Sequence, residues 1–183
     1  MLIPVDAGRA YAYAGVLRGT VPIDEREIRT VAGPFQEAYL VIFNPNFVVG
    51  PAHVLTAVDY ALRAFRLKRN IARSLHVESF LFAAATNDIS KALKLFNPNF
   101  RGNRHIIVVV SKSRESCLRV ANAFAETQGA VYETFQRSKD VAERVTKMLG
   151  ITEVELSTTY AQDFIEAVEK CLLFRMALNF LSR

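Results

Sequence analysis

The stretch His105–Ser111, HIIVVVS, decides the fold class of this 183-residue chain. An unbroken apolar run of this kind is typical of a central strand that is covered on both faces. Further strand patterns precede it at Tyr11–Thr20 and Glu37–Phe43 and follow it at Ala130–Phe135. Helical patterns separate these strands. We therefore expect an α/β protein of the α+β type, in which helices cover a mixed central sheet.

The helices before this strand have recognisable ends. A charged segment, Asp24–Ala32, predicts a short helix. Pro51 opens an amphipathic helix, and Asn70 is expected to end it in the left-handed conformation. Ser74 and Asn87 are placed to cap the next two helices. We find no linker, so residues 1–183 are expected to form a single compact domain.

The last helix is unusually apolar. After a segment expected to be extended, 151–156, Thr159 and Gln162 have the spacing of a capping box, and the helix then runs to about Leu181. Its second half holds few polar residues, which suits either burial in the protein's own core or a surface for a partner. The candidate partner contacts are Phe164, Val168, Leu172, Arg175, Met176 and Phe180.

Positive charge is concentrated before and after the end of the first long helix. No acidic residue occurs between Asp59 and Glu78, whereas five basic residues do, and the net charge of the whole chain is +5. This pattern favours a partner that carries phosphates or clustered carboxylates. A solvated helix end remains an alternative, because cations are also favourable beside the helix dipole. The five residues are Arg63, Arg66, Lys68, Arg69 and Arg73.

Signatures of catalysis are absent from the sequence. It contains no GxGxxG, P-loop, HExxH or CxxC motif, and its three histidines are scattered. We therefore predict neither an enzyme nor a cofactor or metal site. Cys117 and Cys171 lie in apolar helical patterns and are expected to be buried free thiols, which suits the cytoplasm. No stretch has the apolar length that a membrane span needs.

Several short segments occur in a characteristic order and spacing: Val49-Gly50, His53-Val54-Leu55, Ala57, Arg69-Asn70-Ile71-Ala72, Glu78 and Ile89–Ala92. Together with the order of the expected elements, they resemble the PRPK-binding protein family, the small accessory subunit of the KEOPS complex in its archaeal form. The resemblance covers roughly residues 37–182 and leaves the first 36 unmatched.

The resemblance implies a mixed α/β fold and a noncatalytic subunit. Such a subunit binds the N-lobe of a small protein kinase-ATPase, in a complex that supports threonylcarbamoyladenosine synthesis on tRNA, and it binds the single-stranded 3′ CCA end of tRNA. The kinase surface would fall on the C-terminal helices. The RNA site would fall around the basic segment and the turn at 87–91, where this chain has Asn87-Asp88 instead of a basic-amide pair.

We therefore expect phosphates to meet basic side chains, while Asn70 and Ser74 hydrogen-bond to sugars or base edges. An alternative is a pure protein adaptor that activates the kinase and never contacts RNA. The candidate RNA-binding residues are Arg66, Lys68, Arg69, Asn70, Ile71, Arg73, Ser74, Asn87 and Lys91.

Overall fold

The computed structural model describes residues 1–19, 38–98 and 102–183. The described chain forms two compact units, and each combines two separate segments of the sequence. The sheet unit comprises Met1–Pro45 and Asn97–Phe135, and the helical unit comprises Asn46–Phe96 and Gln136–Arg183. The short helix expected at Asp24–Ala32 lies outside the described residues.

A five-stranded sheet dominates the sheet unit, with the strand order β1-β2-β4-β3 and with β5 also paired to β2. Every pairing of the described strands is antiparallel, so the sheet is less mixed than expected. The first strand, whose four residues include Pro4, was not predicted from the sequence. The strands are β1 (Leu2–Val5), β2 (Ala10–Arg18), β3 (Ala38–Phe43), β4 (Arg104–Ser111) and β5 (Val131–Glu133).

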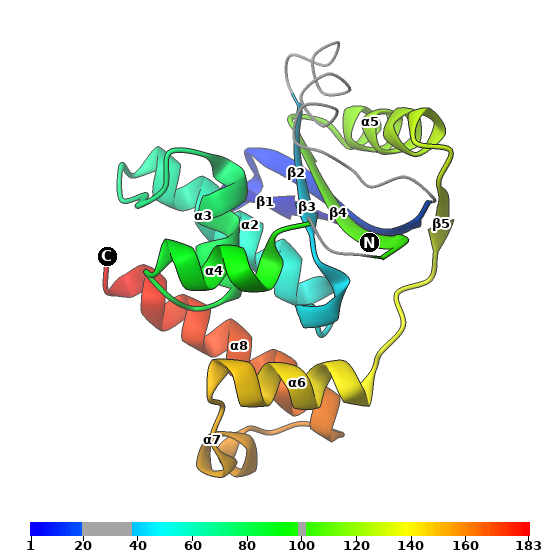
Figure 1. Ribbon diagram of the computed structural model, residues 1–183. Helices are drawn as coiled ribbons and strands as arrows, with labels where there is room; N and C mark the ends of the chain where they lie inside the picture. Colours follow the sequence, from blue (N-terminus) through cyan, green and yellow to red (C-terminus); the bar gives the residue numbers. More distant parts are fainter. Residues whose placement is uncertain (20–37, 99–101) are drawn as a thin grey trace. The chain divides into compact units, whose positions relative to one another are not determined.

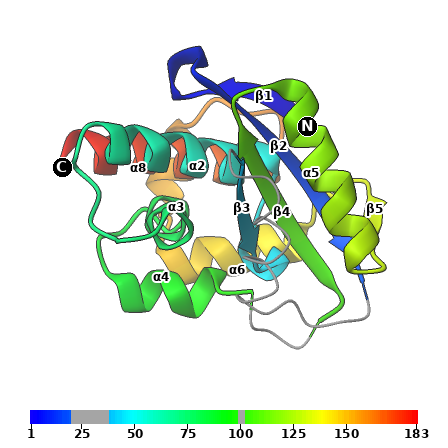
Figure 2. The ribbon, with the colours of Figure 1, turned by 90° about the horizontal axis from the view of Figure 1, so that it is seen from above.

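Strand β4 lies between β2 and β3 and is buried from His105 to Ser111, as the apolar run predicted. Ser111 lies opposite Tyr11 on one side and Ala38 on the other. Helix α5 (Arg114–Thr127) runs beside these strands and closes one core of the unit, with Phe124 fully buried in it (Figure 2). Two short 3₁₀ helices, η1 (Asp6–Gly8) and η2 (Pro45–Phe47), precede β2 and follow β3.

The helical unit is organised around two long helices, α2 and α8, which pack against each other (Figure 1). Helix α3 packs on both of them, α4 packs on α3, and α6 and α7 pack on α8. The six helices are α2 (Pro51–Arg66), α3 (Leu75–Ala83), α4 (Ile89–Phe96), α6 (Lys139–Leu149), α7 (Glu153–Thr158) and α8 (Phe164–Leu181). This arrangement confirms the α+β class and the long C-terminal helix.

Two of the expected helix ends are corrected by the structure. Helix α2 ends at Arg66, and the left-handed residue just beyond it is Lys68, not Asn70: Lys68 has a φ of +57°, and Arg69 N–H donates to Ala64 O over 2.8 Å, which is the Schellman arrangement. Helix α4 is capped by Asp88 instead of Asn87, because Asp88 Oδ1 accepts the Lys91 N–H over 3.1 Å. Ser74 caps α3 as predicted, by accepting the Val77 N–H.

The segment at 151–156 is largely helical, which contradicts the expected extended chain. Thr152 and Glu155 form a capping box, and this local pairing starts α7. Helix α8 is then capped by Asp163, which accepts the Glu166 N–H over 2.9 Å, so the capping expected at Thr159 is also wrong. Thr159 instead bonds back through its hydroxyl to Glu155 O at the end of α7.

The N-terminus of α2 is completed by a side chain from α8. Its N-cap residue, Gly50, has no side chain to offer, and Glu169 Oε1 accepts the His53 N–H over 3.1 Å. Burial raises the pKa of the Glu169 carboxyl. The His53 ring is fully buried and lies 3.0 Å through Nε2 from Ala83 O at the end of α3. These contacts fix the start of α2 relative to α3 and α8.

Candidate functional site

The segment 67–74, which we call the basic loop, connects α2 to α3. Lys68, Arg69 and Arg73 are all exposed in it, and Arg66 is exposed at the end of α2 just before it. Among the described residues, Lys68, Arg69 and Arg73 have no acidic side chain within ion-pair distance. Arg63, the fifth basic residue of the stretch, pairs with Asp59 at 2.7 Å. Three exposed cations therefore lie on the loop itself, next to a fourth at the end of α2.

The backbone of the basic loop is held from beneath by Glu78 of α3. The Glu78 carboxylate is buried, and its Oε2 accepts the N–H groups of Ile71 over 3.0 Å and Ala72 over 2.7 Å. The Asn70 amide donates to Ala72 O over 2.9 Å. Asn70 therefore has a local structural role in this loop. Ile71 points outward, with 42% of its surface exposed.

The predicted turn residues Asn87 and Lys91 are both exposed, at the start of α4. Asn87 is connected to the loop through one side chain: Arg183 Nε donates to Asn87 Oδ1 over 3.1 Å, and Arg183 Nη1 pairs with Glu78 Oε1. The two parts of the predicted RNA site are thus joined in one unit. No pattern in the sequence pointed to Arg183, because its partners lie about a hundred residues away in the chain.

The residues predicted to contact a partner lie mostly inside the helical unit. Val168, Leu172 and Met176 are each 0% exposed, so their side chains belong to the core. Phe180 is half-buried and stacks on Tyr60 of α2 with ring centroids 5.0 Å apart. Phe164 is also only partly exposed. This stripe of α8 therefore faces α2 and α3.

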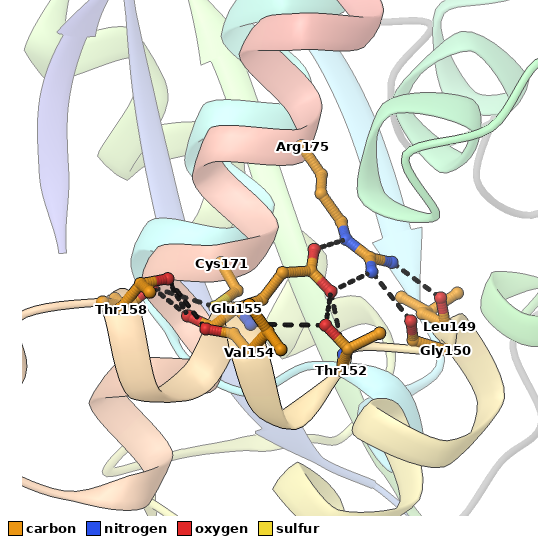
Figure 3. Close-up of polar contacts among 9 residues, drawn as sticks. Leu149, Gly150, Thr152, Val154, Glu155, Thr158, Cys171 and Arg175 are labelled. Atoms are coloured by element: carbon orange, nitrogen blue, oxygen red, sulfur yellow. Dashed lines mark hydrogen bonds and ion pairs between the residues drawn. The ribbon is translucent and has the colours of Figure 1, made fainter.

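Arg175, the sixth of these residues, is engaged within the unit (Figure 3). Its guanidinium forms two hydrogen bonds of 2.6 Å with the Glu155 carboxylate. It also donates to Leu149 O over 2.7 Å and to Gly150 O over 2.8 Å, at the end of α6. The hydrogen bonds that Glu155 accepts from Arg175, together with that from the Thr152 N–H, lower the pKa of the Glu155 carboxyl to about 2. Arg175 thus connects α8 to α7 and to the end of α6 through hydrogen bonds.

The surface of α8 that remains exposed is a second apolar stripe, which is not the one predicted from the sequence. Phe174, Leu178 and Leu181 are 65%, 50% and 75% exposed. Their spacing of four and three residues places them on one helix face. This spacing is visible in the sequence, but the stripe that contains Leu172 and Met176 is equally apolar. The sequence alone therefore could not predict which of the two stripes is buried in the core. We call these three residues the exposed α8 stripe.

Other kinds of site find no support among the residues that the structure describes. No group of histidine, cysteine or acidic residues there is arranged to hold a metal ion. Cys117 and Cys171 are buried free thiols, as expected. Within the same described ranges, no helix combines the length and the apolar character needed to cross a membrane.

Comparison with known protein families matches residues 25–179 to the family described as Kinase binding protein CGI-121. A comparison with curated proteins finds no match. The family match spans most of both units, agrees with the resemblance inferred from the sequence, and confirms the expectation of a noncatalytic protein. The chain therefore belongs to the CGI-121 family of kinase-binding proteins, the noncatalytic kinase-binding subunits of the KEOPS complex.

Proposed function

We propose that this protein binds the single-stranded 3′ CCA end of tRNA through the basic loop and the neighbouring turn at Asn87–Lys91. In this role it serves the KEOPS complex in threonylcarbamoyladenosine synthesis. The observation that carries the proposal is the set of three exposed cations, Lys68, Arg69 and Arg73, with no acidic partner among the described residues. Glu78, the acidic residue beneath the loop, is buried and paired with Arg183.

The chemistry of the loop suits a short RNA end. Lysine and arginine neutralise phosphates, and neutralising each phosphate of a single strand releases counterions. Because the backbone at Ile71 and Ala72 is already hydrogen-bonded to Glu78, little of the loop has to be ordered on binding. The exposed Ile71 side chain adds an apolar surface beside the cations, against which a base can pack.

The second half of the proposal concerns the kinase. We assign its binding to the exposed α8 stripe, Phe174, Leu178 and Leu181. Apolar side chains this exposed on one helix face are typical of a surface that a partner covers. The kinase expected there is the small protein kinase-ATPase of the complex, which would contact α8 through its N-lobe.

The test compares binding of the purified protein to a tRNA with an intact CCA end and to the same tRNA lacking it. We expect a several-fold loss of affinity without CCA, and a log–log salt dependence with a slope of about −0.7 for each neutralised phosphate. Arg69→Gln should make this slope shallower by about that amount. Lys147→Gln, which removes an exposed cation from α6, is the matched control and should leave the slope unchanged.

Three other results would count against the proposal. Equal affinity for both tRNAs would place the contact away from the 3′ end. An unchanged slope in Arg69→Gln would remove the basic loop from the interface. No binding to either tRNA would favour the pure protein adaptor, in which the exposed α8 stripe alone carries the function.

A further inference from the structure

The Arg183 side chain, just beyond the end of α8, lies inside the helical unit, with only 4% of it exposed. Its guanidinium carbon lies 4.1 Å from the centroid of the Phe82 ring. Its nitrogen atoms pair with Glu78 Oε1 and donate to Asn87 Oδ1 over 3.1 Å and to Thr86 O over 3.4 Å. An arginine beyond a helix end ordinarily extends into water, so the burial of this side chain is unusual.

The other oxygen of the same carboxylate holds the basic loop. Glu78 Oε2 accepts the N–H groups of Ile71 and Ala72, while Oε1 pairs with Arg183. The side chain of Glu78 is 0% exposed, and a buried carboxylate keeps its charge only where it is paired and hydrogen-bonded. Arg183 thus places a positive charge directly beside the buried carboxyl group that accepts the two N–H groups of the loop.

We propose that Arg183 is a positioning residue for RNA binding, which acts through Glu78 on the basic loop and through Asn87 on the start of α4. This inference rests on the proposed function of the loop. This means that the loop already has its RNA-bound conformation before the RNA binds. Without Arg183, the ordering of residues 70–72 has to be supplied by the RNA, which weakens binding.

The same geometry connects the RNA site to the kinase surface. Leu181 of the exposed α8 stripe and Arg183 are two residues apart, and the hydroxyl of Ser182 between them bonds back to Asn179 O over 2.9 Å. A kinase bound to the exposed α8 stripe therefore also covers residues 181–183, the turn from which the Arg183 side chain extends. Helix ends fray unless they are held, so such cover favours the inserted position of the arginine.

The experiment measures three properties of Arg183→Met and Arg183→Lys in the full chain. The properties are affinity for a single-stranded RNA ending in CCA, the salt slope of that affinity, and hydrogen exchange at the amides of Ile71 and Ala72. For Arg183→Met we expect about a tenfold loss of affinity, which corresponds to the ordering of about one additional backbone residue on binding. The cations of the loop remain, so the salt slope should keep its wild-type value.

Loss of amide protection at Ile71 and Ala72 should accompany the loss of affinity. Arg183→Lys keeps the charge but not the planar fork of the guanidinium, so it should restore affinity and protection only in part. A general weakening of the fold would instead reduce protection throughout the helical unit. If Arg183→Met does not fold because the buried Glu78 carboxyl group has lost its partner, the same measurements on Arg183→Lys decide the question.

The outcomes separate this inference from the function on which it rests. Wild-type affinity and unchanged amide protection in the substituted proteins would overturn the role of Arg183 while leaving RNA binding in place. Failure of the wild-type protein to bind the RNA would overturn the proposed function, and with it the positioning role. Loss of affinity with a shallower slope would also contradict the inference, because it would make Arg183 a phosphate contact.

Discussion

Gly50 and Glu169 lie so close that no other residue fits at position 50 without displacing the carboxylate. A Cβ built on Gly50 would collide with Glu169 Oε1, the atom that accepts the His53 N–H. The φ of Gly50 is −167°, an extended conformation open to any residue. The requirement for glycine is therefore one of space: the cap of α2 comes from α8 and occupies the place of a side chain.

Gly50→Ala should therefore destabilise the protein. The methyl group displaces Glu169 and removes the cap, and the loss of a helix cap costs about 0.5–2 kcal/mol. Urea unfolding measures the change in the free energy of unfolding. In a Glu169→Ala background the same substitution should cost much less, because the carboxylate is already gone. Equal costs in both backgrounds would contradict this account of the glycine.

Lys68→Gly and Ala85→Gly should both stabilise the protein. Lys68 and Ala85 have φ values of +57° and +46°, which suit glycine at the ends of α2 and α3. The left-handed conformation costs other residues about 1–2 kcal/mol, which exceeds the extra entropy that glycine loses on folding, so a net gain of about 0.5–1 kcal/mol is expected. Thermal unfolding measures it, and a loss of stability in both variants would refute it.

The same pair of variants separates stability from RNA binding. Lys68→Gly removes a cation of the basic loop, whereas Ala85→Gly changes no charge. If the proposed function is correct, only Lys68→Gly should weaken binding to a CCA-ending RNA. Similar affinities in the two variants would show that Lys68 contributes nothing to the interface.

Acid should weaken the fold through His53. Burial lowers the pKa of this fully buried imidazole to about 4, from an ordinary value of 6.5. Between these values the unfolded chain binds a proton that the folded protein does not. His53 therefore costs no stability above pH 6.5. As the pH falls toward 4, it lowers the free energy of unfolding by a total of about 3 kcal/mol.

Urea unfolding at pH 7, 5.5 and 4.5 would measure the loss attributable to His53. Because carboxylates and other histidines titrate too, the useful quantity is the difference between the wild-type protein and His53→Gln. That difference should shrink as the pH falls. A difference that stays constant over this range would show that His53 is not the titrating group.

Leu178→Asp should abolish kinase binding without unfolding the protein. Leu178 is 50% exposed on the stripe, so an aspartate there is solvated in the free protein and buried in the complex. Leu172→Asp places the charge at a 0% exposed position and should unfold the helical unit instead. Pull-down with the purified kinase and circular dichroism distinguish the two effects. Intact kinase binding by a folded Leu178→Asp variant would exclude the stripe.

The sequence predicted the elements whose causes are local. The apolar run in β4 and the Ser74 cap depend on neighbouring residues, and both were found. The capping box of Thr152 and Glu155 was equally local and was overlooked. Asn70, and not Lys68, was expected as the left-handed residue after α2, because Asn has the better intrinsic preference for that conformation. Here the hydrogen bonds of the helix end outweighed that preference.

What the sequence could not predict depends on contacts between distant residues. The basic loop was located by its charge, but its support by Glu78 and Arg183 joins residues 105 positions apart. The choice between the two apolar stripes of α8 depends on where α2 and α3 pack. Periodicity shows that a helix has an apolar face, but when two faces are apolar only the tertiary structure decides which is buried.

The cap that Glu169 provides to α2 has a consequence for the order in which the protein can fold during its synthesis. Helix α2 and its cap are 116 residues apart, and the segment between them includes β4, α5 and β5 of the sheet unit. On the ribosome, α2 is therefore made long before the residue that finishes its first turn. Helix α3 follows α2 directly and can pack on it early, but the part of α2 that α8 covers stays open until α8 emerges. During that interval a chaperone or a premature contact can compete for this part of the helix.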